Sequence, residues 1–198
     1  MWSPVRLLTL ALITVGCAQD GADSPADAGN SDAAADQDAS VANDASRPAK
    51  ICSSCGDCEE SVAAGTALHV IDPVEYTDPP PVGGNHDPCW ADFGVHEEAV
   101  APERWVHNLE HGGVAFLYHC PGGCDAEVAM LASLSTNQRP FALVTEYAAL
   151  PARFAAVAWG HRLVTDCFDA AAFGAFYDAH ADQAPESSTS GRPPACDP

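Results

Sequence analysis

The stretch of residues 72–103 restricts most strongly what this chain can fold into. It reads DPVEYTDPPPVGGNHDPCWADFGVHEEAVAPE, and the consecutive Pro79, Pro80 and Pro81 exclude both a helix and a central strand at that point. A structureless loop of this length inside a compact domain is usually functional or cross-linked. Because it also carries His86 and Cys89, we expect the loop to belong to the folded unit and to its chemistry.

The segments around this loop are either continuous apolar runs, which are typical of buried strands, or have apolar residues at helical spacing, and Asp169 is expected to cap the last helix. This order predicts an α+β fold, namely a small single domain with a mixed sheet, helices on one face, and the long Pro/Gly-rich loop stapled by disulfides. The predicted strands cover residues 67–71, 114–118, 141–145 and 154–159, the last with a continuation through 161–165, and the predicted helices cover residues 126–134 and 169–180.

Residues 1–17 have the pattern of an export signal. Arg6 precedes an apolar stretch that is too short to span a bilayer as a stable helix. Gly16-Cys17 resembles the end of a bacterial lipoprotein signal, although Thr14 stands where leucine is usual. This pattern predicts lipidation at Cys17, with the membrane as partner through an N-terminal anchor and a location outside the cytoplasm in the bacterial envelope. Ordinary cleavage after Ala18, which would give a secreted protein, is the alternative.

The next segment, residues 18–50, is acidic and almost free of large apolar residues. Seven aspartates lie between Asp20 and Asp44 among alanine, serine and glycine, so the segment cannot bury enough surface to offset its ordering entropy. We expect a disordered Ala/Asp-rich tether here, a globular domain at residues 51–186 and a flexible tail at residues 187–198.

The charge of the chain argues against nucleic acid or an anionic membrane surface as a partner. Its formal net charge is −20, with only 8 lysines and arginines, whereas phosphate binding requires clustered cations.

Nine cysteines fit an exported chain. Removal or lipidation of Cys17 leaves an even set, which predicts up to four disulfides with a pairing that the sequence does not fix. A thiolate metal site in the cluster ICSSCGDC is the weaker alternative, because thiols outside the cytoplasm tend to oxidise. The cysteines expected to pair are Cys52, Cys55, Cys58, Cys89, Cys120, Cys124, Cys167 and Cys196.

The segment His107-Asn108-Leu109-Glu110-His111 has the spacing H-x-x-E-H. On a helix His107 and His111 share one face, so both imidazoles could bind one metal ion. Because Gly112 and Gly113 follow at once, we expect a helix of about one turn only. Three interpretations stay open: a metal site in which Glu110 orients a ligand, a metal-dependent hydrolase with Glu110 as general base, and a metal-free His-Glu network that fixes the loop.

Four ordered motifs, over about residues 66–186, resemble those of the bacterial domain of unknown function 3105 family. Two departures are Gly83 in place of a serine and His96 in place of a tyrosine. The matching positions are Pro80, Pro81, Gly83, Gly84 and His86; Trp90, Ala91 and Gly94; Val106, His107, Leu109, Glu110, His111 and Gly112; and Ala158, Trp159 and Gly160. The resemblance identifies the domain and not its activity.

The resemblance implies that His86 accompanies His107 and His111, with His161 a candidate fourth ligand. Three imidazoles beside a carboxylate suit Zn²⁺ or Cu²⁺, and the scarcity of methionine argues against a thioether Cu(I) site. We assign surface or structural roles to the remaining histidines, His69, His96, His119 and His180. An aromatic pocket wall beside the site, or core packing, is expected for Trp90, Trp105, Trp159 and Tyr118. A further function class stays open, namely a non-catalytic, disulfide-stabilised binding or envelope module in which these polar residues only fix the loop.

Overall fold

The structure, a computed structural model, describes residues 49–135 and 138–187. The predicted signal, the lipidation site Cys17, most of the predicted tether, Cys196 and the predicted tail from residue 188 onward lie outside the described residues. Among the helices of the described part, none is both long and apolar enough to cross a membrane.

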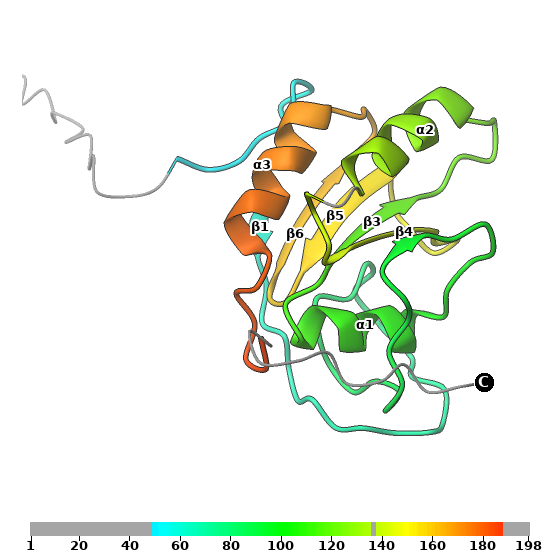
Figure 1. Cartoon of the computed structure of the whole chain (residues 1–198), viewed down its shortest axis with the longest axis vertical. Coiled ribbons are helices and arrows are strands. Elements are labelled where there is room, and N and C mark those ends of the chain that lie inside the picture. The colour runs from blue at the N-terminus through cyan, green and yellow to red at the C-terminus, as the bar shows by residue number, and fades with distance from the viewer. Residues whose placement is uncertain (1–48, 136–137, 188–198) are drawn as a thin grey trace, which may run out of the picture. The chain divides into compact units, whose positions relative to one another are not determined.

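The domain is built on a mixed six-stranded sheet (Figure 1). Its strands lie in the order β1-β6-β5-β3-β4-β2, with β4 parallel to β3 and β2, and the other pairs antiparallel. The strands are β1 (Glu60–Ser61), β2 (Gly94–Val95), β3 (Val114–Tyr118), β4 (Ala142–Glu146), β5 (Phe154–Ala158) and β6 (His161–Thr165). The α+β class expected from the sequence is confirmed.

Alternating side chains of the central strands divide the core into two halves. One face, with Phe116 of β3, packs against α2 (Asp125–Leu134) and α3 (Ala170–His180). The opposite face, with Leu117, packs against α1 (Pro102–Glu110) and the proline-rich loop. In Figure 1, α2 and α3 lie on one side of the sheet and α1 lies on the other. Two helices therefore share a face as expected, whereas the third covers the other face.

Most predicted elements are present, and Asp169 caps α3 by accepting hydrogen bonds from the amides of Ala171 and Ala172. Residues 154–165 form two antiparallel strands, because Gly160 turns the chain with a φ of 74°. The strand predicted at residues 67–71 is wrong, since only His69 forms an isolated bridge there. The one-turn helix expected at H-x-x-E-H is also wrong: α1 has nine residues, because it begins upstream at Pro102.

One disulfide, Cys55–Cys167, joins the N-terminal part of the domain to the segment before α3, and two further disulfides close short loops. The bonded pairs are Cys52–Cys58, Cys55–Cys167 and Cys120–Cys124, and Cys89 is disulfide-bonded as well. The thiolate metal site considered for the ICSSCGDC cluster is therefore excluded, because all three of its sulfurs are in disulfides.

Candidate metal centre

The last turn of α1 presents the H-x-x-E-H residues toward the proline-rich loop. Pro102 suits the first turn of the helix, where its missing N–H costs nothing, and Trp105 and Leu109 anchor the helix in the core. His107 and Glu110 then point to the buried side that faces the loop, and His111 follows as the C-cap residue.

Backbone pairing brings a second segment to the same place. The amide of Val70 donates to the carbonyl of His86 at 2.8 Å, and the amide of His86 donates to the carbonyl of Leu68 at 3.0 Å. This short parallel bridge places His69 beside His86, with ring centroids 5.0 Å apart. The two histidines therefore approach His107 together, each at a ring distance of 4.8 Å.

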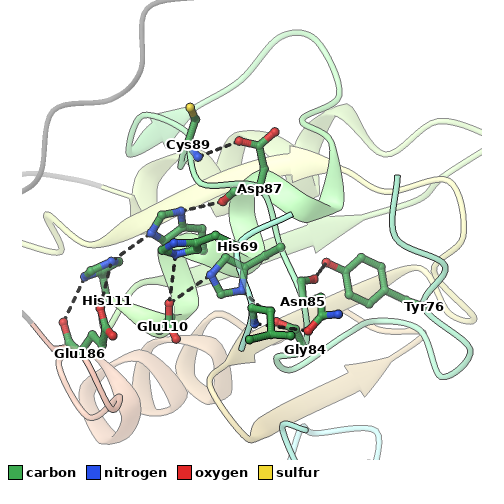
Figure 2. Close-up of polar contacts among 12 residues, drawn as sticks. His69, Tyr76, Gly84, Asn85, Asp87, Cys89, Glu110, His111 and Glu186 are labelled. Carbon is green, nitrogen blue, oxygen red and sulfur yellow. Dashed lines mark hydrogen bonds and ion pairs between the residues drawn. The ribbon is translucent and has the colours of Figure 1, made fainter. Parts of the chain in front are cut away.

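Three of the rings are oriented in the same way, by a bond from Nδ1 to a backbone carbonyl (Figure 2). A carbonyl oxygen only accepts, so each Nδ1 carries the proton and a neutral ring has its lone pair on Nε2. The three bonds join His86 to Gly84 at 2.8 Å, His107 to Asp87 at 2.8 Å and His111 to Glu186 at 3.1 Å. This arrangement is typical of metal-binding histidines, whose other nitrogen is fixed by a hydrogen bond.

Ligand atoms of three histidines and of Glu110 converge. The ligand atoms of His69, His86, His107 and Glu110 all lie within 4.8 Å of one another. Nε2 of His86 lies 3.0 Å from Oε2 of Glu110, yet it has no partner with hydrogen-bond geometry among the described residues. Because this nitrogen is fully buried and lies beside a carboxylate oxygen, its lone pair is well placed to bind a cation.

Burial and charge favour the neutral, ligand form of the central ring. His86 is fully buried, and His107 and Glu110 are each 5% exposed. Burial lowers the pKa of His107 to about 4, which outweighs the hydrogen bond to Asp87 that raises it, and the neighbouring histidines lower it further. His107 is therefore neutral at physiological pH.

The side chains of His69, His86, His107 and Glu110, with the adjacent His111, are called the cluster below. Two of the four predicted aromatic residues lie beside it and two do not. The ring of Trp90 lies 4.7 Å from that of His111, and Trp159 meets His86 edge-on at 6.4 Å. Trp105 packs against Tyr147 in the core, and Tyr118 lies against the core on the α2–α3 face.

The other candidate ligand, His161, is placed elsewhere. It stacks on His180 at 4.2 Å, and its Nδ1 lies 3.2 Å from the hydroxyl of Ser61. The structure instead adds His69, to which the sequence interpretation gave a surface role, and Glu186, which that interpretation did not consider. No local motif marks either residue, although His69 is where the family match described next begins.

Residues 69–192 match the profile of a family described as protein of unknown function (DUF3105). Because the match covers more than half of the 198 residues, the chain belongs to this family, as its motifs predicted. No curated protein and no solved structure matches the chain.

Proposed function

We propose that this domain binds a divalent transition metal through His69, His86, His107 and Glu110. The observation that carries the proposal is the common orientation of the buried rings, whose Nδ1 atoms donate to backbone carbonyls, together with the convergence of one ligand atom from each of the four residues within 4.8 Å of the others. A metal-free network would orient the rings through the same carbonyls. It also accounts for the ion pair of His86 with Glu110, but it gives no reason for the Nε2 atoms of His107 and His111 to lie 3.0 Å apart while both rings donate from Nδ1.

The donors favour Zn²⁺. Imidazole nitrogen and carboxylate oxygen are common zinc ligands, and four of them complete its usual coordination. Cu²⁺ also accepts imidazole, and metal analysis distinguishes the two ions. Cu(I) is disfavoured, because the described cysteines are in disulfides and Met130 lies on α2, which packs on the opposite face of the sheet.

The position of Glu110 favours metal binding over hydrolysis. Its Oε2 atom lies among the ligand nitrogens, 3.0 Å from Nε2 of His86, which is where a ligand lies rather than a general base that needs a metal-bound water. The cavity of about 320 Å³ beside Tyr76 and Arg162 is lined by none of the cluster's side chains. Substrate access to the cluster through this cavity is therefore not supported.

We also propose that the domain works outside the cytoplasm, held at the bacterial envelope by a lipid on Cys17, without nucleic acid as a partner. The disulfides support this location, because such bonds persist in oxidising compartments. Labelling of Cys17 by a radioactive fatty acid, absent in Cys17→Ser, tests the anchor.

The metal proposal is tested on the full chain exported with its own signal, by elemental analysis of the purified protein. His86→Ala and His107→Ala are expected to lose the metal. His96→Ala is the matched control, because this histidine lies in the same loop but bonds to the carbonyl of Asp92. It is expected to retain the metal. Thermal melts confirm that each variant is folded.

Equal metal content in the wild type and both cluster variants would refute the proposal and support the metal-free network. Where a variant does not fold, titration of Zn²⁺ into metal-free wild type replaces it. An unchanged melting temperature at saturating Zn²⁺ would then contradict the proposal.

A further inference from the structure

The cluster contains more potential ligands than one zinc ion takes. Besides the four residues proposed above, His111 and Glu186 form a second group with Glu110, whose ligand atoms also lie within 4.8 Å of one another. Zn²⁺ is usually four-coordinate, so six donors exceed the requirement of a single ion. Glu110 is the one residue that belongs to both groups.

The fold builds this second group from backbone contacts. The amide of Glu186 donates to the carbonyl of Glu110 at 3.1 Å, while Nδ1 of His111 donates to the carbonyl of Glu186, also at 3.1 Å. The amide of Asp182 donates to the carbonyl of Gly112 at 2.9 Å. A Cβ at Gly112 would lie 2.7 Å from Cα of Asp182, so glycine is required for this close approach.

The second group has its own geometry. Nε2 of His111 lies 3.8 Å from Oε2 of Glu186 and 3.0 Å from Nε2 of His107, which belongs to the first group. In Figure 2, Glu110 lies between His69 and the pair of His111 and Glu186. A carboxylate has two oxygens and can therefore bind one cation with each of them.

We infer that the centre holds two divalent ions, with the carboxylate of Glu110 as the bridge between them. This inference rests on the proposed function for the first ion, and it assigns the second ion to His111 and Glu186. Ions in such carboxylate-bridged pairs lie about 3.5–4 Å apart, and the negative charge between them offsets their repulsion.

The two positions differ in exposure and in ligands. The first has three imidazoles and two of them are buried, whereas the second has one imidazole, and the side chain of Glu186 is 59% exposed. The second ion is therefore bound more weakly and exchanges with solution, and a protein purified at low metal concentration carries the first ion alone.

Calorimetric titration of Zn²⁺ into the metal-free full chain tests the inference. Wild type is expected to bind two equivalents, the second more weakly, and Glu186→Gln is expected to bind one. Glu97→Gln is the matched control, because Glu97 is exposed and belongs to neither group. It is expected to bind two equivalents.

Binding of one equivalent by wild type would refute the inference of a second ion. It would indicate that the histidines of both groups share a single ion, and it would leave the proposed function intact. Two equivalents in Glu186→Gln would overturn the assignment of its ligands. No binding by wild type would refute the proposed function itself, so the two failures are distinguishable.

Electron paramagnetic resonance with Cu²⁺ tests the bridge itself. It reports magnetic coupling between two bound ions, which a purely structural role of Glu186 would not produce. Two ions bridged by one carboxylate couple magnetically, so the signal of wild type is expected to broaden when the second equivalent is added. A signal of isolated ions at two equivalents would overturn the bridge.

Discussion

The Nε2 atoms of His107 and His111 lie 3.0 Å apart at the end of α1, and each ring donates from Nδ1 to a backbone carbonyl. In the neutral tautomers this contact brings two lone pairs face to face. A proton or a metal cation relieves the repulsion, and burial works against the proton by lowering the pKa of His107 to about 4. Under the proposed function, the close contact between His107 and His111 at the end of α1 is therefore stabilised by a bound metal ion.

Removal of metal is expected to destabilise the domain. An ion present at about 100 times its dissociation constant stabilises the folded state by about 2.7 kcal/mol, which corresponds to a melting temperature higher by on the order of 10 °C for a domain of this size. Calorimetric melts before and after treatment with a chelator measure the difference. The same treatment of His86→Ala should leave its melting temperature unchanged, and an equal drop in that variant would contradict the explanation.

Binding of Cu²⁺ is expected to quench the fluorescence of Trp90. Its ring lies 4.7 Å from that of His111 and 5.7 Å from that of His107, within reach of quenching by a paramagnetic ion at the cluster. Titration of wild type and of Trp90→Phe measures the effect, which the substitution should reduce, while Trp159, whose ring lies 6.4 Å from that of His86, accounts for quenching that remains. Trp105→Phe is the control, because this indole contacts Tyr147 in the core. Quenching in the double variant Trp90→Phe/Trp159→Phe as strong as in wild type would show that the ion binds elsewhere.

The fold follows from local patterns more fully than the site does. Continuous apolar runs predicted the central strands, helical spacing predicted α2 and α3, and the carboxylate of Asp169 predicted the cap. The start of α1 was not predicted, because the proline-rich pattern of residues 72–103 was interpreted as irregular to its end. Pro102, which fits a first helical turn, was thus included in the loop.

Some of the candidate ligands could be predicted from local sequence patterns, and others could not. His107 and His111 share a helix face, and the family motifs related His86 to them. His69 and Glu186 join the cluster through backbone hydrogen bonds between segments distant in sequence, which leave no periodicity in the side chains. Such contacts depend on the assembled fold, so local sequence reasoning does not find them.

The disulfides are expected to contribute unequally to stability. Cys55–Cys167 joins residues 112 positions apart, and constraining a loop of about that size in the unfolded chain is worth about 4.7 kcal/mol. Cys120–Cys124 spans only 4 positions, for which the same relation gives about 2 kcal/mol. Urea unfolding of the two double Cys→Ala variants compares them. A larger loss from the short pair than from the long one would contradict the chain-entropy explanation.

The cap of α3 is expected to make stability depend on pH in the acid range. Hydrogen bonds from the amides of Ala172, Ser54 and Ala171 lower the pKa of Asp169 from its ordinary value of 3.8. Since the folded state favours the charged carboxylate, this contribution is fully present above pH 3.8 and is lost as the pH falls through the lower folded pKa. Replacement by alanine removes the cap and should cost about 1 kcal/mol at pH 7.

Urea unfolding of wild type, Asp169→Ala and Asp169→Asn at pH 7 and at pH 2 separates the cap from its charge. Asparagine keeps an oxygen that accepts from the helix amides, so Asp169→Asn should be more stable than Asp169→Ala at both pH values. The advantage of wild type over Asp169→Asn should shrink at the lower pH, because the carboxyl group is then protonated in the wild type. Both comparisons are made without metal, so that loss of ions in acid does not contribute. If the advantage over asparagine stayed constant with pH, the carboxylate charge would have no part in stabilising the cap, and the hydrogen bonds alone would account for it.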